Sequence, residues 1–135
     1  MLVEDNAGDA DLVRFMLREC QPRVQLHVAE DGVEGSQFLH KEGKFENVPT
    51  PDLILLDLNL PRRNGKELLR EIKETPWLRM IPAILLSSSN NPRDIQEGYE
   101  AGATAFICKP VDLEEYQAVM AKLVDFWFNI VELAH

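Results

Sequence analysis

The residues best suited to chemistry in this sequence come directly after short apolar runs. Three of them carry carboxylates: Glu4 and Asp5 after "LV", and Asp57 after "LILL". The other two are Ser87, a hydroxyl after "AILL", and Lys109, an amine after "AFIC". A cluster of carboxylates repels itself unless a divalent cation neutralises it, and Mg²⁺ prefers such oxygen ligands. If these groups meet, Asp57 can attack phosphorus beside Mg²⁺, while Ser87 and Lys109 hold the phosphoryl oxygens.

Each of these residues also has a simpler interpretation. An Asp or Ser at the end of a strand commonly starts a turn, a lone lysine is usually solvated, and the pair Glu4 and Asp5 could cap the helix that follows. The functional interpretation depends on whether the fold brings all of these residues to one place.

The hydrophobic pattern alternates between strands and helices along the whole chain. Strands are expected at 1–5, 24–31, 53–58, 81–89 and 105–109, and helices at 9–20, 32–43, 66–75, 92–102 and from about Asp112 onward. Regular alternation of this kind predicts an α/β fold in which a doubly wound, five-stranded parallel sheet lies between helices.

The strand order can be predicted from burial. Val24, Leu26 and Val28 alternate with polar residues, as in a strand at the edge of a sheet, whereas residues 53–58 and 81–89 are apolar on both faces and should be central. The order 2-1-3-4-5 fits this pattern, and ligands of such sheets bind at the carboxyl ends of the strands, where the order reverses between strands one and three.

Composition excludes several classes of protein. The chain has 135 residues and a formal net charge of −9, so we expect a single domain, residues 1–135, that does not bind nucleic acid. It contains no apolar run long enough to cross a membrane, and we expect it in the cytoplasm. Cys20 and Cys108, like the three histidines, lack the spacing of a zinc site.

Four segments together resemble the receiver domains of two-component response regulators. They are "LVEDN", "DLILLDLNLPRRNG", "IPAILLSS" and "GATAFICKP", which occur in the order and spacing of that family. The resemblance extends over essentially the whole chain and implies the flavodoxin-like receiver fold. It also implies that a histidine kinase phosphorylates Asp57.

The resemblance assigns roles to the other residues. It makes Asp5 a direct Mg²⁺ ligand together with Asp57, adds Glu4 through a water molecule, and adds the backbone carbonyl of Asn59. It makes Ser87 and Phe106 the residues that switch on phosphorylation, and it implies a cis bond between Lys109 and Pro110. The chain would then be no enzyme beyond catalysing its own phosphorylation and dephosphorylation.

Two further segments indicate a subfamily. The long "GKFENVPTP" connection and the terminal "FWFNIVEL" resemble small stand-alone receivers that serve phytochrome kinases of cyanobacteria and other bacteria. We therefore expect a phytochrome-type histidine kinase as the partner. The short first strand leaves open whether residues precede Met1.

Two other functions fit parts of the pattern. A Mg²⁺-dependent aspartyl-phosphate phosphatase also uses an aspartate at a strand end, but it generally needs a second aspartate two residues later, where this chain has Asn59. A receiver-like binding module that is never phosphorylated would not need Asp5, Asp57, Ser87 and Lys109.

The C-terminal segment, residues 126–135, continues the last helix as an apolar extension. A helix that is apolar on more than one face is usually buried on two sides, by its own domain and by a partner. We therefore expect a homodimer through this helix, with Trp127 and Phe128 as anchors. The alternative is that the extension folds back onto its own domain.

Overall fold

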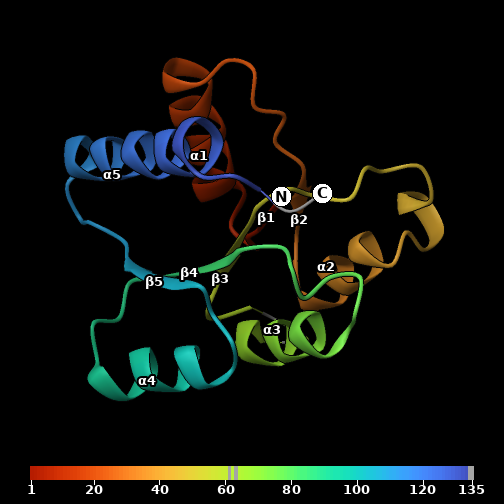
Figure 1. Ribbon diagram of the computed structural model, residues 1–135. Coiled ribbons are helices and arrows are strands. Elements are labelled where there is room, and N and C mark those ends of the chain that lie inside the picture. The colour runs from red at the N-terminus through yellow and green to blue at the C-terminus, as the bar shows by residue number, and fades with distance from the viewer. Residues whose placement is uncertain (61, 63, 134–135) are drawn as a thin grey trace.

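The computed structural model describes residues 1–60, 62 and 64–133. Its centre is a parallel sheet in the order β2-β1-β3-β4-β5, as the sequence predicts (Figure 1). The strands are β1 (Leu2–Val3), β2 (Val28–Ala29), β3 (Ile54–Asp57), β4 (Ala83–Ser87) and β5 (Ala105–Cys108).

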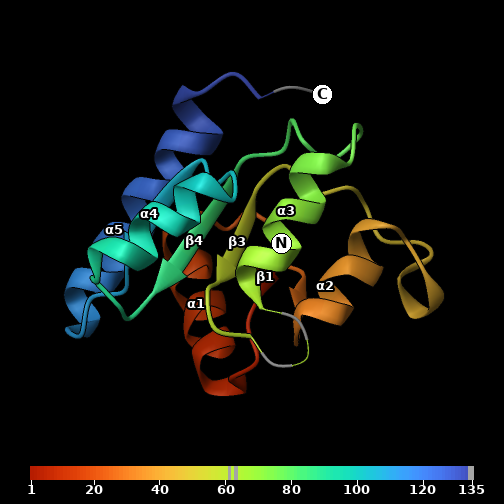
Figure 2. The same cartoon turned by 90° about the horizontal axis from the view of Figure 1, so that it is seen from below.

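Helices cover both faces of the sheet. They are α1 (Ala7–Cys20), α2 (Gly32–Leu39), α3 (Gly65–Glu74), α4 (Pro92–Glu100) and α5 (Leu113–Asp125). Figure 1 shows α1 and α5 on one face, and Figure 2 shows α2, α3 and α4 side by side on the other. The predicted doubly wound arrangement is therefore confirmed.

Alternating strand residues divide the core into two layers. Ile54, Leu56 and Leu85 pack with the layer that includes α2 and α3. Leu55 and Ile84 face α1 and α5. Both faces of β3 and β4 are thus apolar, which explains why these strands read as unbroken hydrophobic runs in the sequence.

Several elements are shorter than the sequence predicts. β1, expected at 1–5, has only Leu2–Val3, and β4, expected at 81–89, has Ala83–Ser87. The strand expected at 24–31 is limited to Val28–Ala29, because the neighbouring β1 contributes only Leu2 and Val3 to the pairing. The helix expected to reach Gly43 ends at Leu39. The chain then enters the left-handed region at Lys41 (φ 55°) before a 3₁₀ turn at Gly43–Phe45.

The predicted cis bond between Lys109 and Pro110 is wrong, since this bond is trans. Trans is the intrinsically preferred isomer of an X–Pro bond, and the cis expectation rested on the family resemblance alone. The side chain of Lys109 still reaches the carboxylates of Glu4 and Asp57.

The last helix changes its winding near its end. The helix expected from about Asp112 onward is α5, which Asp112 caps by accepting a hydrogen bond from the Glu114 N–H, and a π-helical turn, η2 (Phe126–Ile130), follows it. Trp127 and Phe128 are half-buried against the α1 and α5 layer of the core, whereas Phe126 and Ile130 are exposed. The final two residues of the predicted extension lie outside the described residues. None of the helices in the described part of the chain is long and apolar enough to cross a membrane.

Candidate functional site

The structure brings an amine and two carboxylates together where β1, β3 and β5 end. Lys109 Nζ donates to Glu4 Oε1 at 3.0 Å and to Asp57 Oδ2 at 3.1 Å. The side chains of all three residues are largely buried. The sheet order explains why these side chains meet. β1 and β3 are neighbours, and only β4 lies between β3 and β5, so the three strand ends lie at one edge of the sheet.

Burial and charge oppose each other in this cluster. The pKa of Glu4 is raised to about 7, mainly by burial and in smaller part by the nearby charge of Asp57, while the hydrogen bond from Lys109 acts in the opposite direction. Burial also disfavours the charge of Lys109, but Asp57 and Glu4 outweigh that effect and raise the pKa of the amine. Lys109 is therefore a permanent cation, whereas Glu4 can change its charge near neutral pH.

The carboxylates are close enough to bind one metal ion together. Glu4, Asp5 and Asp57 each offer an oxygen atom, and these atoms all lie within 4.8 Å of one another. Asp5 is exposed and Glu4 is buried, so the cluster reaches from the solvent into the protein. A set made only of oxygen ligands suits a hard divalent cation.

A different residue caps the helix that follows these carboxylates. The side chain of Asn6 accepts a hydrogen bond from the Asp9 N–H at 2.9 Å, so the cap of α1 is Asn6 and not the pair Glu4 and Asp5. The Asn6 N–H in turn donates to Glu4 Oε2 at 3.3 Å. The two carboxylates are thus free for the site, and the simpler helix-cap interpretation is wrong.

The segment after β3 begins with contacts to Asp57. The Asn59 N–H donates to Asp57 Oδ1 at 3.1 Å, while Leu58 and Leu60 anchor the segment in the core. A Cβ atom at Gly65 would lie only 2.4 Å from the backbone oxygen of Asp57. The absence of a side chain at Gly65 therefore lets the first turn of α3 pack directly against the end of β3.

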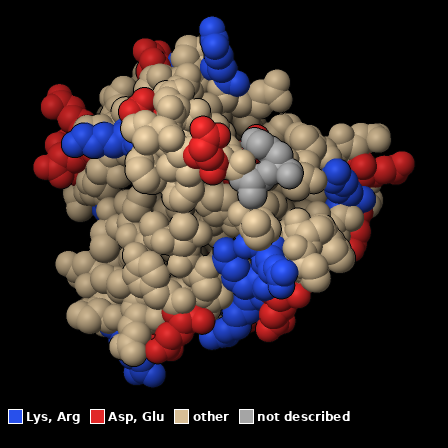
Figure 3. All heavy atoms as spheres, in the orientation of Figure 1, with Lys and Arg blue, Asp and Glu red and all other residues tan. Residues whose placement is uncertain are grey.

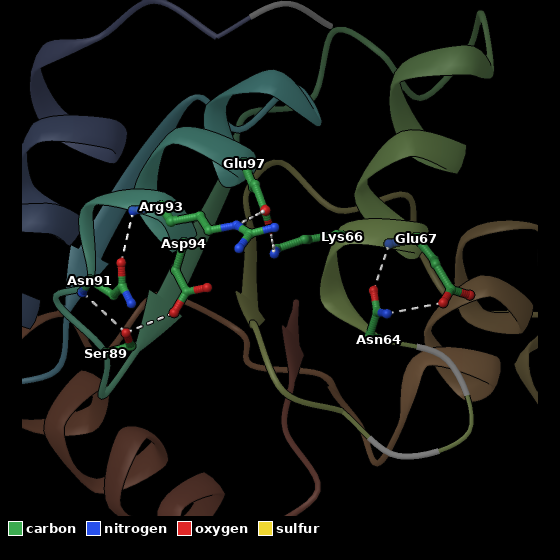
Figure 4. Close-up of polar contacts among 8 residues, drawn as sticks. All are labelled: Asn64, Lys66, Glu67, Ser89, Asn91, Arg93, Asp94 and Glu97. Atoms are coloured by element: carbon green, nitrogen blue, oxygen red, sulfur yellow. Dashed lines mark hydrogen bonds and ion pairs between the residues drawn. The ribbon is translucent and has the colours of Figure 1, made fainter.

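Ser87 ends β4 and is almost fully buried. Its Oγ accepts a hydrogen bond from the Ser89 N–H at 3.0 Å, which leaves its own hydroxyl hydrogen available to donate. Ser89 Oγ donates to Asp94 of α4 at 2.8 Å, as Figure 4 shows. A short chain of hydrogen bonds thus leads from Ser87 to α4.

Phe106 lies under α4. Its ring is half-buried, and a Cβ atom at Gly98 would lie 3.1 Å from Phe106 Cδ2 and 2.8 Å from Leu85 Cδ1. The Phe106 N–H donates to Tyr99 Oη at 3.2 Å. Phe106 is therefore in contact with α4, the helix to which Ser89 is also bonded.

A polar bridge that the sequence pattern does not reveal joins two helices. Glu97 of α4 accepts hydrogen bonds from Lys66 of α3 and from Arg93, one turn earlier in α4 (Figure 4). The spacing of Arg93 and Glu97 in the sequence does indicate a pair within one helix. The pairing with Lys66 depends on helix packing, which the sequence pattern does not contain.

Comparisons with known proteins agree with this geometry. Residues 1–121 match the family model of the response regulator receiver domain. The chain is 37% identical to the response regulator Rcp1 of Synechocystis sp. over 133 residues, which cover 98% of this chain and 90% of that protein.

Solved structures give the same result. The crystal structure of the phosphorylated cyanobacterial phytochrome response regulator RcpA superimposes with a TM-score of 0.94 at 36% identity, and the Mn²⁺-bound form of Rcp1 with 0.92 at 36%. Each comparison covers 99% of this chain and 96% of the other. The family predicted from the four sequence segments is thus confirmed, and the chain belongs to the response regulator receiver domain family.

Proposed function

We propose that this response regulator accepts a phosphoryl group from a histidine kinase on Asp57, with Mg²⁺ as the cofactor, and signals through contacts with other proteins. The observation that carries the proposal is the arrangement of charges around Asp57. One of its oxygens accepts a hydrogen bond from Lys109 at 3.1 Å, and the carboxylates of Glu4 and Asp5 complete an oxygen cluster within 4.8 Å.

The chemistry of the transfer follows from these positions. A carboxylate oxygen of Asp57 attacks the phosphorus atom of a phosphohistidine, an O–P bond forms, and the N–P bond to the imidazole breaks. Lys109 then holds a phosphoryl oxygen in place of the Asp57 oxygen that it holds now. The Ser87 hydroxyl donates to a second phosphoryl oxygen.

The same oxygen cluster has the donors that a magnesium ion needs. Asp5 and Asp57 would bind the ion directly, Glu4 through a water molecule, and Asn59 through its backbone carbonyl. When bound, the ion supplies positive charge that neutralises the phosphoryl oxygens. The Mn²⁺-bound form of the related Rcp1 supports a divalent cation for this fold.

The response to phosphorylation would involve α4. When Ser87 is drawn toward the phosphoryl group, its hydrogen bond with the Ser89 N–H changes, and with it the link from Ser89 to Asp94. Phe106 can then turn into the space that Ser87 leaves. The surface formed by α4 and β5 would change shape as a consequence.

A phytochrome-type histidine kinase is the proposed donor. The support is the similarity to Rcp1 and to the phytochrome response regulator RcpA over nearly the whole chain. We also propose a cytoplasmic location, since Cys20 and Cys108 are both free thiols.

The proposed partners are proteins and a second copy of this chain, and not nucleic acid. The net charge of −9 opposes binding to a phosphate backbone, and on the face that Figure 3 shows, Lys and Arg side chains lie beside Asp and Glu. Exposed Phe126 and Ile130 at the C-terminal turn supply the apolar surface for a homodimer.

The test is phosphoryl transfer from a purified phytochrome histidine kinase that has first been phosphorylated with labelled ATP. We expect the label to move to the wild-type chain in the presence of Mg²⁺ and to remain on the kinase with Asp57→Asn. Transfer to Asp57→Asn would contradict the assignment of Asp57. Hydrolysis of a generic phosphate ester by the wild type would favour the phosphatase alternative.

A further inference from the structure

An ion pair next to the site joins two loops that are distant in the sequence. Arg62, in the segment between β3 and α3, donates through Nε to Asp31 Oδ2 at 2.9 Å, and its Nη2 lies 2.7 Å from the same oxygen. Asp31 lies between β2 and α2. In the sheet, β1 lies between β2 and β3, so the ion pair crosses the end of β1. Glu4 and Asp5 follow β1 directly.

Asp31 is a rigid anchor for this pair. Its other oxygen, Oδ1, accepts a hydrogen bond from the Glu34 N–H at 2.8 Å and so caps α2. Only 13% of its side chain is exposed. Burial disfavours the charged carboxylate, but the Glu34 N–H and Arg62 outweigh burial and lower the pKa of Asp31.

Arg62 is held in an unusual backbone conformation. Its φ is +62°, in the left-handed region that residues other than glycine rarely adopt. Leu58 and Leu60 are buried in the core, and the bond between Arg62 and Asp31 links the described part of this segment to the loop between β2 and α2. Asn59, the proposed carbonyl ligand, lies in the same segment.

We propose that Arg62 is a positioning residue, which through Asp31 holds the segment bearing Asn59 in the place where the divalent cation and the phosphoryl group bind. This inference rests on the proposed function of Asp57. It predicts that the ion pair contributes to metal affinity, although neither Arg62 nor Asp31 is one of the proposed metal ligands.

Metal binding by an Arg62 variant separates positioning from a simple charge effect, because the two predict changes in affinity of opposite sign. Removing the positive charge of Arg62 should strengthen binding of a divalent cation if charge alone matters, and removing the negative charge of Asp31 should weaken it. If the pair acts by positioning, both changes weaken binding. Arg62→Gly removes the ion pair while tolerating φ +62°, and Asp31→Asn retains a good capping residue for α2.

The experiment is a titration of the full chain and its variants with Mn²⁺ alone, followed by calorimetry. We expect Arg62→Gly and Asp31→Asn each to weaken binding about two- to fivefold, the range available to an exposed ion pair, and the double variant to be no weaker than the weaker single variant. Arg93→Ala removes an arginine of the same charge whose partner is Glu97, and it should not weaken binding.

A second measurement needs no metal. In the metal-free protein, hydrogen exchange of the Asn59 amide, which is bonded to Asp57 Oδ1, should become faster in Arg62→Gly but not in Arg93→Ala. Unchanged or stronger Mn²⁺ binding by Arg62→Gly overturns the inference. If the wild type itself binds no divalent cation, the proposed function fails instead, so the two failures can be told apart.

Discussion

At the scale of single residues, Lys109 and a metal ion would compete for the Asp57 carboxylate. Lys109 bridges Glu4 and Asp57 in this structure, and the same carboxylates are the proposed metal ligands. A cation that binds there must share these oxygens with the lysine. The roles of Lys109 in metal binding and in phosphoryl binding can therefore be separated by mutation.

Replacing Lys109 with methionine should leave divalent-cation affinity unchanged or increase it, because a competing positive charge is removed. The same variant should accept a phosphoryl group from acetyl phosphate about a hundredfold more slowly, as expected for loss of a charged donor to the reacting group. Calorimetry with Mg²⁺ and the rate of phosphorylation measure the two effects. A greater loss of metal affinity than in Asp5→Asn would contradict this assignment.

The raised pKa of Glu4 gives a prediction for stability. The pKa is about 7 in the folded protein and 4.5 in the unfolded chain, so between these values the folded state binds more protons and the free energy of unfolding falls as pH rises. Glu4→Gln cannot ionise. Relative to this variant, the wild type should lose up to about 3 kcal/mol between pH 4.5 and pH 7 without divalent cations.

Urea unfolding at several pH values in this range measures the difference. Both proteins share every other titrating group, so their difference isolates Glu4. A difference between the two proteins that stays constant with pH would show that burial does not hold back the ionisation of Glu4.

The sequence indicated that Glu4, Asp5, Asp57 and Lys109 would lie close together because each of them follows an apolar strand, and the structure brings these four together. Strand ends are visible as the last residues of hydrophobic runs, and a parallel sheet brings such ends to one edge. Asn6 as the cap of α1 and the pair of Asp31 with Arg62 were not predicted. The capping choice depends on local backbone angles, and the ion pair joins residues whose distance is set only by the folded loops.

At the scale of elements, α4 has a weak apolar attachment. Gly98 is its only buried residue, and polar contacts provide much of the rest: Ser89 with Asp94, and Lys66 and Arg93 with Glu97. α3, in contrast, buries Leu68, Leu69 and Ile72. This difference should make α4 easier to displace than α3 when Ser87 changes its hydrogen bonds.

Two glycine substitutions test how tightly α3 and α4 are packed. In Gly98→Ala the new methyl group meets Leu85 Cδ1 and the ring of Phe106, which are side-chain atoms that can shift, so we expect a loss of about 1–3 kcal/mol of stability. In Gly65→Ala the new methyl group meets backbone oxygens of Asp57 and Leu58, which cannot shift in this way, so the loss of stability should be larger. Urea unfolding of the two variants measures this order.

A loss in Gly98→Ala equal to or greater than that in Gly65→Ala would contradict the idea that α4 is the more adaptable element. Gly65→Ala should also slow phosphorylation of Asp57, because the end of β3 is displaced.

Secondary structure was predicted well where the hydrophobic period was long and regular. α3 lies within one residue of its expected bounds and β4 lies inside its expected segment, while β1, β2 and the end of α2 fall short of theirs. The residues around Val24 to His27 have an alternating pattern, but alternation alone does not supply a strand partner. The isomer of the Lys109–Pro110 bond also lies beyond what hydrophobic pattern can indicate.

At the scale of the whole molecule, the C-terminal turn carries the exposed apolar side chains on which the homodimer hypothesis depends. Trp127 and Phe128, the anchors expected from the sequence, are half-buried against their own core, whereas 48% of Phe126 and 64% of Ile130 are exposed. The helical period does not reveal this division because the winding becomes π-helical at Phe126. The homodimer hypothesis therefore now depends on Phe126 and Ile130.

Sedimentation at micromolar concentration should find the wild-type chain as a dimer and the double variant Phe126→Gln/Ile130→Gln as a monomer, since exposed apolar groups drive such contacts. These substitutions spare the residues that pack internally. If the wild type sediments as a monomer both with and without acetyl phosphate, the dimer hypothesis is wrong and the exposed residues await another partner.

The central claim is that Asp57 is the phosphoacceptor of this receiver, and intact-mass spectrometry tests it most directly. After incubation with acetyl phosphate and Mg²⁺, the wild type should gain the mass of one phosphoryl group, and it should lose this gain when a chelator replaces Mg²⁺ in the incubation. Asp57→Asn should gain none under either condition. A phosphoryl group on Asp57→Asn, or none on the folded wild type, would contradict the account.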